Sequence, residues 1–139
     1  MPAMKTPFKT IAIVGKYMQP EAVMQMRDQI LSIAQFLSDK ALKVLIEHKT
    51  AEYSAIQGFN TIEMQKIGEQ ADLTIVLGGD GTMLSVARSL YETPTPLIGI
   101  NRGRFGFLTD LRTEDMLEAL DRILVGQYTL EQRMLLAAQ

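Results

Sequence analysis

The sequence predicts an α/β fold, in which an open, mostly parallel β-sheet carries helices on both faces. Short apolar, β-branched runs alternate along the chain with segments of helical periodicity, and this alternation implies parallel strands joined by crossover helices. Two glycine-rich segments, 78–81 and 101–107, each directly follow a predicted strand. Because ligands of such sheets gather at the carboxyl ends of the strands, these two loops mark the expected site.

The first part of the chain contains two predicted strands and one long helix. Thr10–Gly15 (TIAIVG) and Lys43–Glu47 (KVLIE) are short apolar runs typical of buried strands. Pro20 lies in the first turn of the helix between them. Apolar residues at three- and four-residue spacing give this helix one apolar face: Val23, Met26, Ile30, Ile33, Ala34 and Leu37. Residues 48–60 show no periodicity, so we predict a loop there that exposes His48.

The middle of the chain contains the clearest predicted strand. A short helix is expected over Ile62–Glu69, and Asp72–Leu77 (DLTIVL) then reads as a strand buried on both faces. The turn Gly78–Gly81 follows this strand. Thr82–Leu90 has the pattern of a helix, which Pro94 brings to an end.

One more strand, one loop and one helix complete the predicted domain. Leu97–Ile100 (LIGI) is the strand, and Asn101–Phe107 is the loop after it. Thr113 caps a helix that runs to about Leu124, with Gly126 as its stop signal. The next segment begins to alternate like a strand and then becomes an apolar run at the end of the sequence.

The composition excludes several classes of function. The 139 residues suit one domain, and 47% apolar residues with 22% charged residues are typical of globular proteins. The net charge of −2, spread along the chain, does not indicate a nucleic-acid partner or an acidic membrane surface. The absence of cysteine removes disulfides, thiolate metal sites and cysteine nucleophiles, and a single histidine cannot build a histidine-rich metal site. With no signal peptide and no apolar run near the roughly 18 residues of a membrane span, we expect a cytoplasmic protein without a membrane partner.

The segment Gly78-Gly79-Asp80-Gly81-Thr82 carries the most chemical information. Its glycines allow a phosphate to approach backbone N–H groups, and the following helix turns its positive end toward the same place. Asp80 does not suit a passive phosphate cradle, since a carboxylate repels phosphate. It suits a site in which it holds Mg²⁺ or accepts a proton from an attacking hydroxyl. The alternative is that Gly-Asp-Gly is only a tight turn in which Asp80 caps a helix.

The second glycine-rich loop, Asn101–Leu108 (NRGRFGFL), has features of a nucleotide-binding loop. Arg102 and Arg104 could reach phosphates, and Phe105 and Phe107 offer flat faces to a purine. The alternative is a surface loop whose phenylalanines fill the core. Neither loop is a Walker A motif and no G-x-G-x-x-G occurs, which disfavours an ordinary P-loop enzyme or a Rossmann dehydrogenase.

Together the two segments resemble a known family. GGDGT, followed about twenty residues later by PLIGINRGRFGFLTD, is similar to the pattern of the bacterial NAD kinases. GGDG by itself is shared with diacylglycerol and sphingosine kinases, and the second segment discriminates against those lipid kinases. The resemblance extends from TIAIVGK to RMLLAA. It implies an ATP-dependent phosphorylation of the adenosine-ribose 2′-hydroxyl of NAD, which gives NADP.

The resemblance also implies roles for individual residues. Asp80 corresponds to the family's proposed base for the 2′-hydroxyl, and Phe107 and Leu108 correspond to the adenine side of the NAD site. The implied substrate-binding set is Gly78, Gly79, Asp80, Gly81, Thr82, Asn101, Gly103, Phe107 and Leu108. Mg²⁺ or another divalent cation is expected to arrive with ATP, and we assign no residue to bind a metal. The position matched by Ser85 is often arginine in that family, which puts a phosphate contact there in doubt.

The resemblance implies that part of the enzyme is absent. We expect an α/β domain over residues 1–127, and in residues 128–139 the start of a missing β-rich domain that holds much of the dinucleotide. The 139-residue chain by itself is therefore expected to be inactive, and the full-length enzyme is expected to be a homo-oligomer. Two alternatives stay open: a diacylglycerol- or sphingosine-type lipid kinase, and a non-catalytic nucleotide-binding module.

Overall fold

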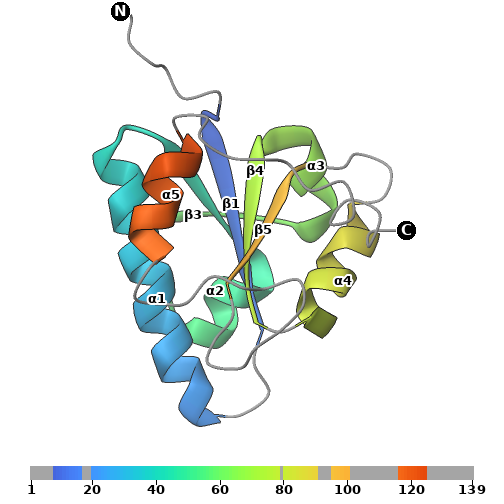
Figure 1. Ribbon diagram of the computed structural model, residues 1–139. Coiled ribbons are helices and arrows are strands. Elements are labelled where there is room, and N and C mark those ends of the chain that lie inside the picture. The colour runs from blue at the N-terminus through green and yellow to red at the C-terminus, as the bar shows by residue number, and fades with distance from the viewer. Residues whose placement is uncertain (1–7, 17–19, 79, 91–94, 101–115, 125–139) are drawn as a thin grey trace, which may run out of the picture.

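The computed structural model describes residues 8–16, 20–78, 80–90, 95–100 and 116–124. Within these ranges, five strands form a single sheet in which every neighbouring pair is parallel (Figure 1). The order across the sheet is β3-β2-β1-β4-β5. The strands are β1 (Thr10–Gly15), β2 (Lys43–Glu47), β3 (Asn60–Ile62), β4 (Leu73–Leu77) and β5 (Leu97–Ile100). The predicted α/β fold with a parallel sheet is confirmed.

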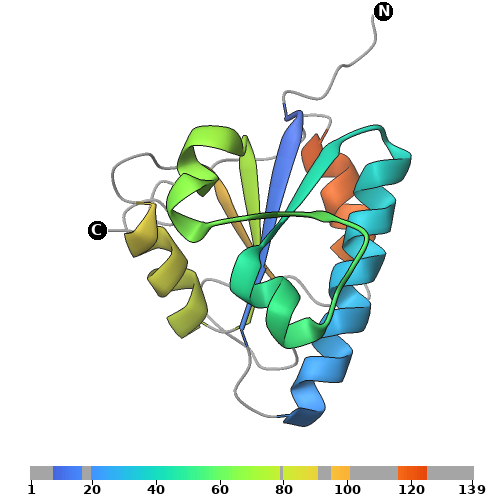
Figure 2. The same ribbon diagram turned by 180° about the vertical axis from the view of Figure 1, so that it is seen from behind.

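Helices cover both faces of this sheet. The described helices are α1 (Pro20–Asp39), α2 (His48–Ser54), the 3-10 turn η1 (Met64–Lys66), α3 (Ile67–Gln70), α4 (Asp80–Ser89) and α5 (Met116–Leu124). Figure 1 looks onto the face that α1 and α5 cover, and Figure 2 shows α2, α3 and α4 from the other side. None of the described helices is long and apolar enough to cross a membrane.

Two separate apolar layers hold the helices to the sheet. On one face, the apolar side of α1 packs with α5 against residues of β1 and β4 such as Ile13 and Ile75, whose side chains are fully buried. On the other face, α3 and α4 pack against alternate residues of the same strands, among them Val14 and Val76. The apolar positions predicted for α1 are confirmed from Met26 onward, because five of them are buried: Met26, Ile30, Ile33, Ala34 and Leu37.

The predicted loop over residues 48–60 is wrong. The segment folds into α2 and the short edge strand β3, which pairs with β2 from Asn60 to Ile62. Helix α2 buries only one apolar side chain, Ala51, so its sequence shows no apolar periodicity that would have predicted a helix. Its boundaries are set by hydrogen bonds and backbone geometry: the Glu47 side chain accepts from backbone N–H groups at the start, and Ala55 takes a left-handed conformation (φ 53°) at the end.

Smaller differences concern where the helices begin. The predicted helix Ile62–Glu69 is divided between the end of β3, the turn η1 and the four residues of α3. Helix α4 begins at Asp80, two residues before the predicted start at Thr82, so part of the glycine-rich segment belongs to the helix. The predicted cap of α5 at Thr113 lies outside the described residues.

The order of the strands reverses between β1 and β4. From β1 the chain moves outward to β2 and β3, and it then returns to the other side of β1 for β4 and β5. Gly15 and Leu77, the last residues of the two central strands, are register partners. In open α/β sheets a crevice forms at the carboxyl ends of strands at such a reversal, and ligands bind there.

Candidate functional site

The glycine-rich turn after β4 lies at this reversal. The Lys16 N–H donates to the carbonyl oxygen of Leu77 at 3.3 Å, and the Gly78 N–H donates to the carbonyl oxygen of Ile100 at 3.3 Å. The loop that leaves β1 is therefore tied to the end of β4, and the loop that leaves β4 is tied to the end of β5. The first of the two predicted loops thus begins at the place where the fold class concentrates ligands.

Gly78 is the glycine on which the geometry of this turn depends. Its φ is +147°, a conformation that L side chains rarely adopt. A Cβ atom there would lie 2.9 Å from Thr82 Oγ1 and 3.3 Å from the Lys16 carbonyl oxygen. The lack of a side chain thus allows the turn to close over Thr82 and against the loop after β1.

Gly81 has a different environment from Gly78. It is exposed within α4, and a Cβ atom there would meet nothing within 4 Å. Its backbone is not in the positive-φ region, so, unlike at Gly78, the backbone conformation does not require glycine there. If Gly81 is required, the reason must be the space it leaves for a ligand.

The first turn of α4 presents backbone N–H groups and the positive end of the helix dipole at the same edge of the sheet. Asp80 is the first residue of this helix, so the chain position predicted to act on a hydroxyl lies at the helix start. The structure thus brings together four of the predicted residues: Gly78, Asp80, Gly81 and Thr82. The side chain of Asp80, together with Gly79, Asn101, Gly103, Phe107 and Leu108, lies outside the described part of the chain.

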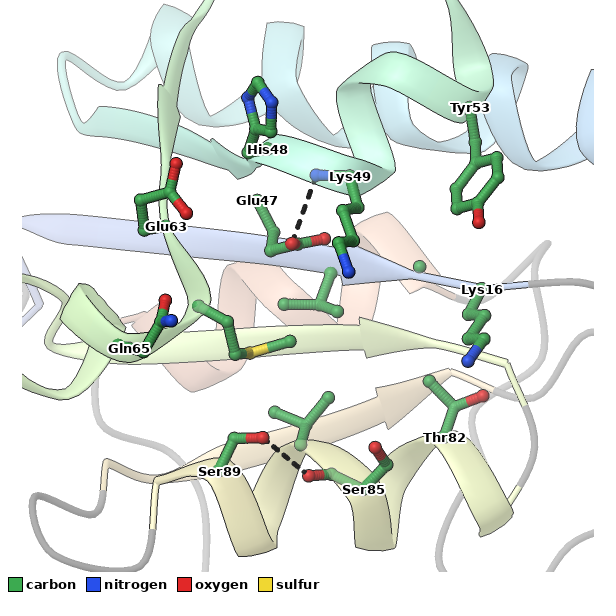
Figure 3. A pocket seen from close by; sticks show the side chains of 14 residues that line it. Lys16, Glu47, His48, Lys49, Tyr53, Glu63, Gln65, Thr82, Ser85 and Ser89 are labelled. Atoms are coloured by element: carbon green, nitrogen blue, oxygen red, sulfur yellow. Dashed lines mark hydrogen bonds between the residues drawn. The ribbon is translucent and has the colours of Figure 1, made fainter.

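A cavity of about 350 Å³ opens between α4 and α2 at this edge. One wall is the polar side of α4, which carries the hydroxyls of Thr82, Ser85 and Ser89 (Figure 3). The facing wall is α2, whose exposed residues there are His48, Lys49 and Tyr53. The remaining lining residues are Val14, Gly15, Lys16, Glu47, Glu63, Met64, Gln65 and Val86.

The cavity has two chemically different ends. Figure 3 shows the Lys16 side chain directed toward Thr82 at one end, beside the start of α4, while Glu63 and Gln65 lie at the other end. Lys49 points into the space between them. A cation, hydroxyls and a helix start at one end suit an anionic group such as a phosphate chain. A cavity of this volume is within the range of small-ligand sites.

Glu47 lies in the cavity wall with its charge engaged by neighbouring donors. The residue is only 6% exposed, and its carboxylate accepts from the N–H of Lys49 at 3.1 Å and of Thr50 at 2.9 Å. Glu47 therefore caps α2, because these donors are two of the N–H groups at the helix start that have no partner within the helix. Among the described residues, no three histidine, cysteine or carboxylate side chains come together as a metal site.

Comparison with known proteins decides the family. Residues 11–128 match the family described as the ATP-NAD kinase N-terminal domain. The chain belongs to this family. The membership that GGDGT and PLIGINRGRFGFLTD indicated is therefore confirmed.

Related proteins agree with this assignment. The chain is 46% identical over 132 residues to the NAD kinase of Nitrosomonas europaea, covering 95% of this chain and 43% of that protein. It is 45% identical over 139 residues to the NAD kinase of Aromatoleum aromaticum, covering 99% of this chain and 45% of that protein. The chain thus spans less than half the length of these relatives.

Solved structures show the same fold at lower sequence identity. Yeast NADH kinase complexed with NADH superposes with a TM-score of 0.72 at 19% identity, over 87% of this chain and 37% of that one. An NAD kinase from Archaeoglobus fulgidus in complex with ATP gives a TM-score of 0.56 at 24% identity, over 81% and 36% of the two chains. These similarities establish that the α/β arrangement is shared.

Sequence reasoning missed the α2 wall of the site. His48 was predicted to lie in an exposed loop; it is exposed, but it lines the cavity, as does the exposed Lys16. His48 is the first residue of α2, and Lys49 follows it. The available signal was a strand that ends in a carboxylate, Glu47, placed to cap the residues after it, but glutamate is not among the residues preferred as helix caps.

Proposed function

We propose that this chain is the N-terminal domain of a NAD kinase, which transfers the γ-phosphoryl group of ATP to the adenosine-ribose 2′-hydroxyl of NAD and yields NADP. The observation that carries the proposal is the position of Gly78–Thr82 at the strand-order reversal, beside a cavity of about 350 Å³. Support for the substrates comes from relatives named NAD kinase and from neighbours of the same fold described with NADH and with ATP.

In this proposal Asp80 acts on the attacking hydroxyl. The 2′-oxygen forms a bond to the γ-phosphorus while the bond from that phosphorus to the β–γ bridging oxygen breaks, so ADP leaves. The hydroxyl proton passes to the Asp80 carboxylate. Because a normal aspartic acid has a pKa of roughly 3.9, far below that of a sugar hydroxyl, Asp80 orients the hydroxyl early and accepts its proton late.

We assign the cavity between α4 and α2 to ATP. Its phosphate chain lies at the end formed by Lys16, Thr82 and the start of α4, and the nucleoside extends toward Gln65. The described lining offers hydroxyls and lysines and no cluster of three carboxylate or histidine ligands. This fits a divalent cation carried mainly by the phosphate oxygens, where it would neutralise phosphate charge.

NAD is assigned to the second glycine-rich loop and to residues beyond this domain. Asn101, Gly103, Phe107 and Leu108 line the adenine side in the proposal, and Gly79 and Gly81 leave room for the reacting groups. Residues 1–127 form the α/β domain, residues 128–139 begin a β-rich domain, and the full-length enzyme is a homo-oligomer. Completing the dinucleotide site then requires the second domain.

The test is an assay of ATP-dependent NADP formation by the full-length parent, with NAD and NADH supplied in turn. Formation of NADP, with no phosphorylation of diacylglycerol or sphingosine in parallel reactions, supports the proposal. Phosphorylation of a lipid in place of NAD would move the enzyme to the lipid kinases. Nucleotide binding without phosphoryl transfer to any of these acceptors would favour a binding module.

The division into domains makes a separate prediction for the 139-residue chain. It should fold, as judged by circular dichroism, and yet form NADP far more slowly than the parent. Positioning of bound reactants can contribute roughly 7–11 kcal/mol toward a barrier, so losing the groups that hold one substrate should nearly abolish turnover. A rate close to that of the parent would show that the site is complete within these residues.

A further inference from the structure

A buried hydrogen-bond network connects the α2 wall of the cavity to the end of β1. Thr50, in α2, is fully buried, and its Oγ1 accepts from the Gly15 N–H at 3.0 Å. The same oxygen lies 2.8 Å from Glu47 Oε1 and 3.1 Å from the Gly15 carbonyl oxygen. Its single proton can serve one of these acceptors at a time, and the carboxylate is the closer and the charged one. Residues 35 positions apart in the chain are joined in this way.

This network fixes the backbone beside both lysines of the cavity. Gly15 directly precedes Lys16, so the hydroxyl of Thr50 determines where the loop after β1 begins. The Glu47 carboxylate meanwhile accepts from the N–H of Lys49. Lys16 and Lys49 belong to different elements, yet one carboxylate–hydroxyl pair, Glu47–Thr50, holds the main chain of each at the edge of the cavity.

We propose that Glu47 and Thr50 are positioning residues for the phosphate chain of ATP, acting through the backbone of Lys16 and Lys49. This inference rests on the proposed function. A lysine is a long, flexible side chain with a compact charge, and its electrostatic effect depends on where its backbone places it. Because Glu47 is surrounded by donors and buried, it fixes these positions without offering a free carboxylate to the phosphates.

Thr50→Val is the informative variant, because it keeps the branched shape and removes the hydroxyl. The Gly15 N–H then has no threonine oxygen to bond, and the end of β1 must shift or accept water. Losing such a bond corresponds to about a tenfold effect on an equilibrium, so in the full-length parent KM for ATP should rise about tenfold. KM for NAD should stay within about twofold, since the NAD side is assigned elsewhere.

Two further variants test whether the hydroxyl itself is responsible. Thr50→Ser retains it and should restore KM for ATP to within about threefold of the parent value. Thr74→Val is the matched control: Thr74 is equally buried, its hydroxyl lies 3.0 Å from that of Thr95, and it does not line the cavity. The control should lower the melting temperature while leaving the ratio of the two KM values unchanged.

A double-mutant cycle with Lys16→Met tests the route. If Thr50 acts through Lys16, the Lys16→Met change should raise KM for ATP in the parent and add little in the Thr50→Val background. Full additivity of the two changes would overturn the route through Lys16. Should Thr50→Val fail to fold, Glu47→Gln takes its place in the cycle with Lys49→Met, because an amide nitrogen cannot accept from the Lys49 N–H.

The outcomes separate this inference from the proposed function. A parent that forms no NADP removes the proposed function, and the inference falls with it. An active parent in which Thr50→Val is folded and shows an unchanged KM for ATP overturns the positioning role and leaves the function intact. A Thr50→Val that raises both KM values equally, as a general loss of packing would, also overturns it.

Discussion

The two helices that face each other across the cavity, α4 and α2, begin in different ways. Helix α4 follows a glycine with φ +147° and starts within the motif GGDGT. Helix α2 follows β2 directly and is capped by the carboxylate of Glu47, the last residue of that strand. Both helices begin at the carboxyl edge of the sheet, so each presents its first turn at the edge where the cavity lies.

The difference shows how two walls of one site can be encoded. At α4 the structural requirement is local in sequence. The tight turn has no room for a side chain at Gly78, so it requires a glycine, which is visible in the sequence. At α2 the requirement is a contact between Thr50 and Gly15, which are far apart in the chain. The residues that make such a contact form no recognisable sequence motif. We therefore expect chemistry to depend on the α4 side and substrate placement to depend on the α2 side.

The sharpest test of this division is Asp80→Asn in the full-length parent. Removing the proposed proton acceptor should lower kcat about 10²- to 10⁴-fold while leaving NAD affinity within about threefold. Glu47→Gln, on the α2 side, should instead act mainly on KM for ATP. Steady-state kinetics with each substrate varied in turn measures both effects.

The control for Asp80→Asn is Asp28→Asn, an equally conservative change at an exposed position of α1. It should leave kcat unchanged. A near-normal kcat in Asp80→Asn would remove Asp80 from the chemistry, and a collapse of kcat in Glu47→Gln would erase the division between the two walls.

A smaller effect is expected from the two glycines of the α4 side. Gly78→Ala places a methyl group in a conformation that costs on the order of 1–3 kcal/mol, with an added overlap on Thr82 Oγ1 at 2.9 Å. Gly81→Ala should leave stability unchanged or raise it by up to about 1 kcal/mol, because alanine is the better helix former. Urea unfolding of the two variants measures the difference.

The activity of the Gly81→Ala variant tests whether this glycine contacts the nucleotide, which a stability measurement does not test. A stable but inactive protein would indicate that the glycine leaves space for the nucleotide. Full activity would argue that this part of the turn never meets the substrate. Equal losses of stability in Gly78→Ala and Gly81→Ala would contradict the geometry described for the turn.

Most of the sheet could be predicted because its signals are local. The central strands are continuous apolar runs, and β1, β2 and β5 have the predicted bounds. The long helix α1 was equally visible, since its buried positions recur at helical spacing. The first half of the site followed from the same logic, because Gly78–Thr82 comes directly after a strand in a fold that binds ligands there.

The α2 side could not be predicted, for a physical reason. Helix α2 has seven residues, and the side chains it buries are Thr50, Ala51 and Ser54, which produce no apolar stripe. Strand β3 has three residues, two of them exposed, and is held by pairing at the sheet edge. Elements that depend on capping and on partners distant in sequence become visible only when those partners are placed in space.

The smallest predicted effect tests the end of α2. Ala55 has φ 53° and ψ 42°, the left-handed conformation in which helices commonly stop, and it is exposed. An alanine in that conformation is strained by roughly 1 kcal/mol relative to glycine, so Ala55→Gly should stabilise the protein by up to about that amount. The matched control is Glu52→Gly, an exposed position inside the same helix, where glycine should cost up to about 1 kcal/mol. Opposite signs in chemical denaturation would establish that α2 is a helix ending at Ala55. A loss of stability in both variants would return residues 48–60 to the loop that their sequence suggests.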